Sequence, residues 1–160
     1  MTIATIRKAK PSDVGDIHHL LMELAVFEKI DHLVESNEGS THRALFGEPS
    51  SAEALVAELD GSIIATAIYF HNYSTFMGRK GLYLEDIYVK PDFRGQGIGK
   101  TLLVELAKTA ITRGCPRMEW TVLDWNTKAI DFYNKIGANI MTDWRLVRLS
   151  GNDIETLANQ

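Results

Sequence analysis

The chain has 160 residues, of which 45% are hydrophobic and 24% charged, a composition that predicts one domain over residues 1–160 with a single core. The net charge is −4 and no basic patch dominates, so nucleic acid is not expected as a partner, whereas a cationic substrate is compatible. Cys115 is the only cysteine, which excludes an intramolecular disulfide and disfavours a zinc cluster. No signal peptide or membrane-spanning run is recognisable, and we therefore expect a cytoplasmic protein without a membrane partner.

The first quarter of the chain reads as a strand followed by two helices. Residues 2–8 alternate in polarity and predict the first strand. Pro11 is tolerated in a first helical turn, and the apolar spacing after it predicts an amphipathic helix to about Lys29. A second, short helix is expected from a cap at Ser36 to about Phe46.

Two apolar runs then predict a β-hairpin. Residues 53–59 and 62–71 are joined by Asp60-Gly61, a pair typical of tight hairpin turns. Residues 72–81 are polar and contain two glycines, so a connection is expected there. Residues 82–89 are apolar and rich in strand formers, and they predict a central, largely buried strand.

The second half predicts two more helices and two more strands. After the central strand a helix is expected from Ile98 to Gly114, followed by a strand at 117–123. Asn126 then caps a helix over 127–136, and a last strand is expected near 143–149. The order of elements predicts an α/β fold in which helices cover both faces of a mixed, mainly antiparallel sheet.

Three glycines lie where the central strand gives way to a helix. Gly95, Gly97 and Gly99 should leave several backbone N–H groups unpaired at the positive end of a helix dipole, which is a site for an anion and most often for phosphate. The spacing does not match a dinucleotide fingerprint. It does not match a Walker loop either, because the first glycine of that motif would fall on Arg94.

The segment Arg94-Gly95-Gln96-Gly97-Ile98-Gly99 resembles the R/Q-x-x-G-x-G/A motif of the Gcn5-related N-acetyltransferases, abbreviated GNAT. Flanking segments are similar to the diamine (spermidine/spermine) and thialysine N-acetyltransferase branch of that family. They are Leu84-Glu85-Asp86-Ile87-Tyr88-Val89, Val122-Leu123-Asp124-Trp125-Asn126 and Ala129 to Ala138. The resemblance covers nearly the whole chain and implies the GNAT fold, acetyl-coenzyme A as co-substrate and no metal.

The resemblance also implies which residues hold the coenzyme. The motif cradles the pyrophosphate, Arg94 and Lys100 either add charge there or are solvated, and the strand before the motif pairs with the pantetheine arm as an added strand would. Asn126 contacts the coenzyme besides capping its helix. The expected coenzyme-binding residues are Ile87, Tyr88, Val89, Arg94, Gly95, Gln96, Gly97, Ile98, Gly99, Lys100, Asn126, Lys128, Ala129 and Tyr133.

Acetyl transfer to an amine must remove a proton from an ammonium group with a pKa of about 10.4 and supply one to a thiolate. Glu85 interrupts the apolar central strand and is the candidate base, with burial raising its pKa or a water relaying the proton. Alternatively, Glu85 pairs with an arginine such as Arg7. Asp86 should point to the other side unless a bulge intervenes, and it either makes a local hydrogen bond or helps to bind the amine.

Tyr133 matches the tyrosine that acts as the acid in the resembling family. A phenol is protonated at pH 7 and can donate a hydrogen bond to the leaving sulfur. Without the resemblance, the alternative to a catalytic role is a structural one, in which Tyr133 is a core tyrosine that packs beside Phe132 and Ile136.

The acceptor pocket needs acids for the cationic groups and an apolar wall for the methylenes. The residues expected to contact the acceptor are Phe27, Glu28, Glu85, Asp86, Glu119, Trp120, Thr121 and Trp144. Each of these acids can also be a solvated surface charge. The five histidines have no metal-ligand spacing.

The residues and the resemblance together predict direct transfer, in a ternary complex, to a primary amine of a diamine, a polyamine or a lysine-like amino acid such as thialysine. Two alternatives stay open. One is the same chemistry on another amino acid, an aminoglycoside or a protein lysine, and the other is a non-catalytic module that binds acyl-coenzyme A. The resemblance further implies a homodimer, to which a strand such as 143–149 contributes.

Overall fold

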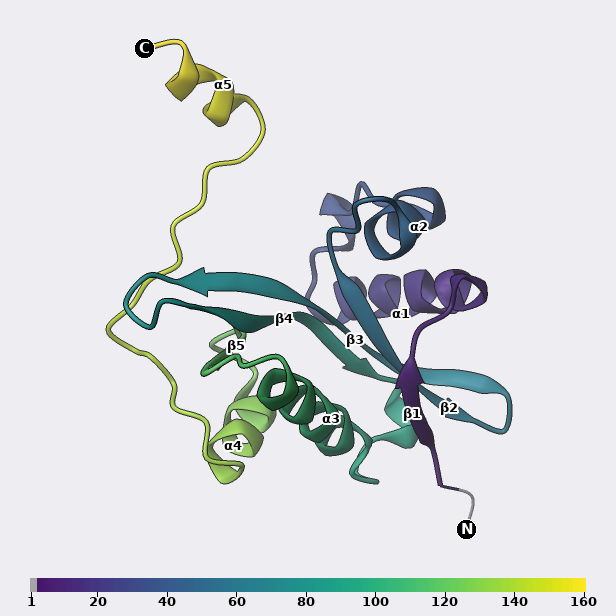
Figure 1. Ribbon diagram of the computed structural model, residues 1–160. Coiled ribbons are helices and arrows are strands. Elements are labelled where there is room, and N and C mark those ends of the chain that lie inside the picture. The colour runs from purple at the N-terminus through teal and green to yellow at the C-terminus, as the bar shows by residue number, and fades with distance from the viewer. Residues whose placement is uncertain (1–2) are drawn as a thin grey trace. The chain divides into compact units, whose positions relative to one another are not determined.

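The computed structural model of the protein describes residues 3–160 and divides them into two compact units, residues up to Thr121 and residues Val122–Gln160 (Figure 1). The first unit holds the whole sheet. The second unit holds two helices, α4 (Thr127–Lys135) and α5 (Asn152–Ala158), joined by a segment without regular structure.

The sheet has five strands in sequence order, β1-β2-β3-β4-β5. They are β1 (Thr5–Lys8), β2 (Glu53–Leu59), β3 (Ser62–Ser74), β4 (Arg79–Val89) and β5 (Met118–Glu119). Neighbouring strands are antiparallel except for the parallel pair of β4 and β5. The predicted mixed, mainly antiparallel sheet is therefore confirmed.

Helices cover both faces of this sheet (Figure 1). One face carries α1 (Val14–Phe27) and α2 (Glu38–Phe46), which bury Ile17, Leu20 and Leu45 against side chains of β2, β3 and β4. The other face carries α3 (Ile98–Thr112), whose buried side chains include Leu102, Leu103 and Leu106. Short 3₁₀ helices η1 (Pro11–Asp13), η2 (Asp31–Leu33) and η3 (Pro91–Phe93) lie before α1, before α2 and before α3.

The predicted elements differ from the observed ones mainly at their ends. The expected strand 2–8 begins at Thr5, although residue 2 lies outside the described residues, and the first helix starts with η1 before α1. The cap of α2 is Asn37 rather than Ser36, because the Asn37 side chain accepts a hydrogen bond from the Ser40 amide at 3.0 Å. The connection expected at 72–81 is shorter than predicted: only residues 75–78 form a turn, because β3 and β4 remain paired from Asn72↔Gly81 to Ser74↔Arg79.

The larger differences fall in the last third of the chain. The strand expected at 117–123 is paired only at Met118 and Glu119, after which β5 ends. The strand expected at 143–149 is absent from the described residues, and α5 follows this segment, over residues for which no element was predicted.

A β-bulge in β4 reverses the alternation of its side chains. Ile68 pairs with Asp86 and Tyr69 pairs with Leu84, so Glu85 is an extra residue without a partner on β3. Before the bulge, Leu84 lies on the face covered by α3. After it, Asp86 and Tyr88 lie on the face covered by α1, where Tyr88 joins the core with Ile17 and Leu20.

Candidate active site

The glycine loop has the backbone geometry that the sequence predicts. Gly95 has φ 77° and Gly97 has φ 81°, values that residues with a Cβ rarely adopt. Nothing lies within 4 Å of a Cβ built on either glycine, so the dihedral angle and not crowding requires glycine there. Gly97 is the N-cap of α3, and its conformation turns the chain from the loop into the helix.

The start of α3 presents unpaired amides to solvent. The Thr101 amide donates to Gly97 O at 2.9 Å, which is the first bond of the helix. Within residues 3–160, the amides of Ile98, Gly99 and Lys100 have no such acceptor, and no side chain caps them. Because α3 has 15 residues, these amides sit at the positive end of a substantial dipole and can bind a diphosphate.

Arg94 lies against two aromatic rings. Its Nε donates to Val89 O at 2.8 Å, and its guanidinium carbon is 5.4 Å from the ring centroid of Phe27 and 5.2 Å from that of Tyr88. Burial and a hydrogen bond with Glu23 raise the pKa of Tyr88. Sequence reasoning gave the Tyr88 side chain no role beyond forming a strand, and it missed Glu23, which lies one helical turn before Phe27 on α1.

The edge of β4 that faces β5 is open beyond the first few residues. β5 pairs with β4 only at Leu82↔Met118 and Tyr83↔Glu119. From Leu84 to Val89, no strand within residues 3–160 occupies that edge, while the opposite edge pairs with β3 at every residue except Glu85. An extended ligand such as a pantetheine arm can therefore add to β4 beside the glycine loop.

Three carboxylates gather where α1 ends and β4 bulges. Asp86 is largely buried, and its pKa is raised from 3.8 to about 6, mainly by desolvation and further by the negative charges of Glu85 and Glu28. Burial also raises the pKa of Glu28, the residue that ends α1. None of the cations in the described residues forms an ion pair with Asp86, so an ammonium group would supply the missing charge.

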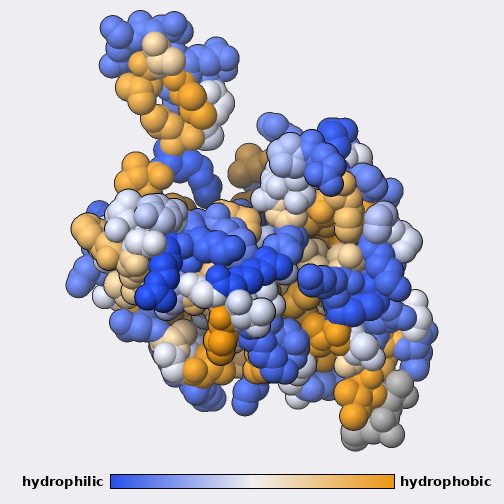
Figure 2. Space-filling model, in the orientation of Figure 1, coloured by the Kyte–Doolittle hydropathy of each residue, from blue (hydrophilic) through white to orange (hydrophobic). Residues whose placement is uncertain are grey.

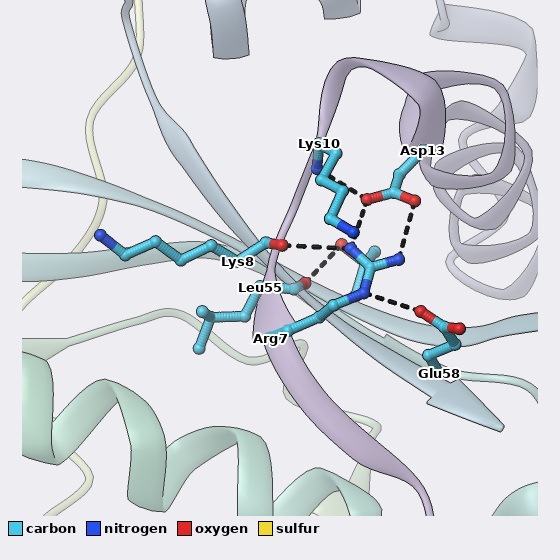
Figure 3. A network of polar contacts seen from close by, with 7 residues as sticks. Arg7, Lys8, Lys10, Asp13, Leu55 and Glu58 are labelled. Atoms are coloured by element: carbon cyan, nitrogen blue, oxygen red, sulfur yellow. Dashed lines mark hydrogen bonds and ion pairs between the residues drawn. The ribbon is translucent and has the colours of Figure 1, made fainter.

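Glu85 differs from its expected environment. It is exposed and occupies the bulge, so burial, one of the two alternatives expected for it, is wrong and falls on Asp86 instead. The other alternative, a relaying water, stays a prediction. The alternative pairing with Arg7 is wrong as well. Arg7 donates to Asp13 at 2.7 and 3.0 Å and to Glu58 Oε2 at 2.7 Å (Figure 3). Glu85 therefore makes no ion pair with Arg7 and stays available to solvent.

The other expected acceptor residues of the first unit differ in burial and in their contacts. Glu119 lies 2.9 Å from Arg117 Nε and accepts a hydrogen bond from Asn72 at 3.3 Å, so its charge is offset before any substrate binds. Trp120 is half-buried and Thr121 is exposed where β5 has ended. Phe27 is 39% exposed and contacts Arg94, which places an apolar surface directly before Glu28.

The second unit carries the remaining candidates. Asn126 caps α4 by accepting a hydrogen bond from the Ala129 amide at 3.3 Å, as predicted. Tyr133 is buried, and its ring centroid lies 5.6 Å from that of Phe132. Lys128 is exposed on the first turn of α4, and Trp144 is 76% exposed in the segment that follows this helix.

Comparison with known proteins identifies the family. Residues 16–138 match the acetyltransferase (GNAT) family. The chain belongs to this family. It is therefore an N-acetyltransferase that uses acetyl-coenzyme A as co-substrate, and the glycine loop and the open β4 edge lie within the matched region.

Curated relatives of this acetyltransferase cover its full length. It is 39% identical to the thialysine N-epsilon-acetyltransferase of Mus musculus and 37% identical to that of Bos taurus, with 100% of each chain aligned. It is 30% identical to the L-ornithine N5-acetyltransferase NATA1 of Arabidopsis thaliana, over 95% of this chain and 86% of the relative.

A solved structure has the same fold over the whole chain. The integron cassette protein VCH_CASS6, from the mobile metagenome of V. cholerae, superposes with a TM-score of 0.83 at 27% identity, covering 100% of this acetyltransferase and 99% of that chain. The GNAT fold that the sequence predicts is therefore confirmed.

Within residues 3–160, no group of three or more histidine, cysteine or acidic side chains is arranged to hold a metal ion. None of the helices in that part of the chain is long and apolar enough to cross a membrane.

The glycine loop yields a paired test. Gly97→Ala should raise the dissociation constant for acetyl-coenzyme A by 10-fold or more, because alanine strains the left-handed N-cap that aims the amides. Gly99→Ala should have a much smaller effect, because its Cβ would meet only Val89 Cγ2 at 3.8 Å. Isothermal titration calorimetry measures both constants, and equal losses in the two variants would contradict this account of the loop.

Asp86 yields a stability test. Because its folded pKa of about 6 lies above the unfolded value of 3.8, ionised Asp86 destabilises the fold fully above pH 6 and not at all below about pH 3.8. Asp86→Asn should thus raise the free energy of unfolding by roughly 1–3 kcal/mol at pH 7.5, with little gain at pH 4. Urea unfolding at both pH values measures this. Asp60→Asn, in the β2–β3 turn, is the control, and a gain independent of pH would contradict the prediction.

Proposed function

We propose that the chain transfers the acetyl group of acetyl-coenzyme A to the terminal primary amine of a lysine-like amino acid, such as thialysine, or of a diamine or polyamine. The observation that carries this proposal is the cluster of Glu28, Glu85 and Asp86, which lacks a partner cation and lies beside an open strand edge. The full-length relatives named as thialysine N-epsilon-acetyltransferases support the lysine-like acceptor.

In this proposal the first unit binds both substrates. The amides after Gly97 hold the pyrophosphate, with charge from Lys100, and the open edge at Ile87, Tyr88 and Val89 receives the pantetheine arm. Phe27 provides the apolar wall for the methylenes of the acceptor. Gly95, Gln96, Ile98 and Gly99 shape the loop, and Arg94 fixes the loop against Phe27 and Tyr88. Glu119, Trp120, Thr121 and Trp144 are the outer acceptor contacts that the sequence indicates.

The second unit supplies the acid. At pH 7 about one alkyl amine in 10³ is neutral, so the carboxylates at the bulge remove the ammonium proton. Glu85 is the candidate base from the sequence because it interrupts an apolar strand. Tyr133 donates a hydrogen bond to the departing sulfur, and Asn126, Lys128 and Ala129 contact the coenzyme from the start of α4. The family match covers residues 16–138, which supports a single N-acetyltransferase domain.

We further propose a homodimer located in the cytoplasm, without a nucleic acid or membrane partner. Support for the dimer comes from the segment after α4, where Trp144, Leu146 and Val147 are 76%, 72% and 89% exposed. Figure 2 shows apolar side chains exposed on α5 as well. An extended, apolar segment with strand-forming residues can pair with a second chain. The lone Cys115 suits a reducing compartment.

The acceptor is tested by release of coenzyme A thiol across a panel of amines. We expect thialysine, lysine, ornithine, putrescine and spermidine to include the best acceptors, and a lysine peptide or an aminoglycoside to react far more slowly. Turnover of only the peptide or the aminoglycoside would overturn the acceptor class. Tight binding of acetyl-coenzyme A without thiol release for any amine would favour a binding module.

Tyr133 is tested by Tyr133→Phe, which should lower kcat by 10-fold or more, because the donor to the sulfur is lost. The dissociation constant of acetyl-coenzyme A should change little. Tyr73→Phe, on the exposed end of β3, is the matched control and should keep wild-type turnover. Steady-state kinetics and calorimetry measure the two quantities, and wild-type kcat in Tyr133→Phe would remove this residue from the mechanism.

The dimer is tested by Val147→Asp, which should convert a dimer into a monomer by placing a charge in the shared apolar segment. Ser150→Asp adds the same charge without replacing an apolar side chain and should leave the dimer intact. Light scattering after size-exclusion chromatography gives the mass of each variant. A monomeric wild-type protein at micromolar concentration would contradict the proposal.

A further inference from the structure

We propose that Asp86, and not Glu85, is the catalytic residue that accepts the proton lost by the acceptor amine, and that Glu85 passes this proton to solvent. This inference rests on the proposed function, because it assigns a step within the same amine site. It also changes the role of Glu85, which is the base expected from its place in the apolar central strand.

The bulge places Asp86 where a bound amine is shielded from water. Its register partner Ile68 is buried in the core between the sheet and α1, and Tyr88, two residues along the strand, joins the same core. The Asp86 carboxylate therefore lies on the α1 face and at an apolar boundary. Glu85 occupies the bulge and is exposed, so water competes there for its hydrogen bonds.

The charged groups around Asp86 come from two elements. Glu85 faces it from β4, and Glu28 faces it from the C-terminal end of α1. Both are acids, and none of the described lysines, arginines or histidines forms an ion pair with Asp86. The site therefore attracts an ammonium group and leaves Asp86 free to exchange a proton with it.

The environment also adjusts the basicity of Asp86. Its pKa of about 6, against an ordinary 3.8, makes the carboxylate a stronger base by roughly 10²-fold while most of it remains ionised at pH 7. A base whose pKa lies close to the working pH combines the correct charge with the strongest proton affinity. Glu28 and Glu85 contribute to this adjustment through their negative charges.

The proposed step balances in protons and electrons. Asp86 takes one proton from the ammonium group, and the freed lone pair of the nitrogen forms a bond to the thioester carbonyl carbon. The carbon–sulfur bond then breaks, and the thiolate takes a proton from Tyr133. The acylated nitrogen still carries one excess proton, which it gives to the Tyr133 phenolate, so that a neutral amide forms and the phenol is restored. Protonated Asp86 passes its proton through Glu85 to water, which leaves one proton released for each amide formed.

The test compares the pH dependence of kcat/KM for thialysine at saturating acetyl-coenzyme A. The wild type should show an acid limb near pH 6, because protonated Asp86 cannot accept the proton. Asp86→Asn should lower kcat by about 10²-fold and abolish this limb, and Asp86→Glu should restore part of both. Glu85→Gln and Glu28→Gln should keep the limb but move it to lower pH, by roughly half a unit, because each removes a repelling charge.

A second acceptor separates proton transfer from binding. The aminooxy analogue of lysine is mostly neutral at pH 7, so it needs no base before attack. The loss in Asp86→Asn should shrink from about 10²-fold with thialysine to less than about 5-fold with this analogue. A purely structural or binding role would reduce both acceptors alike. Asp60→Asn, in the β2–β3 turn, is the matched control and should behave as the wild type.

The inference is overturned if Asp86→Asn keeps the acid limb, if Glu85→Gln abolishes it, or if the two acceptors lose equally in Asp86→Asn. These outcomes differ from failure of the proposed function. A wild-type protein that acetylates no amine of the panel would refute that function, whereas an active wild type with an unchanged limb in Asp86→Asn would refute only the role of Asp86.

Discussion

The bulge at Glu85 is the constraint on which the amine site depends. An uninterrupted strand would place Leu84, Asp86 and Tyr88 on one face, and the aspartate would then lie beneath α3. One unpaired residue shifts the register, so that Leu84 stays beneath α3 while Asp86 and Tyr88 turn toward α1. The same shift brings the Tyr88 ring beneath Arg94, which connects the strand to the glycine loop.

The first unit thereby joins two opposite electrostatic environments within one strand–loop–helix segment. The amides at the start of α3 suit a diphosphate, and the carboxylates at the end of α1 suit an ammonium group. In the part of the chain that the structure describes, no side chain caps those amides and no cation forms an ion pair with Asp86. This arrangement sacrifices stability in the free protein, since buried Asp86 remains ionised above its pKa, and the binding of the two substrates recovers it.

The sequence predicts the parts of this site that depend on local chemistry. Glycines at 95 and 97 are required by their own backbone angles, and Asn126 caps its own helix, so no distant residue is needed to predict either.

The exposure of Glu85 was not predictable, because nothing in Leu84-Glu85-Asp86 marks a bulge, and its register is set by pairing with β3. The paired ends of β3 and β4 were missed for a similar reason, since their polar residues are held by cross-strand bonds rather than by an apolar pattern. The strand expected at 143–149 is not formed, because no partner strand within residues 3–160 pairs with this segment.

The open edge of β4 has a consequence for handling the protein. Backbone groups from Leu84 to Val89 lie in the middle of the chain's main sheet, yet only one side of them is paired. Such an edge can template the addition of an unrelated extended chain and so begin aggregation. A ligand that is not a protein strand occupies the edge of β4 and presents no new strand edge to a further chain. Coenzyme bound along β4 would thus reduce aggregation of the protein, and preparations without coenzyme would be the ones that precipitate.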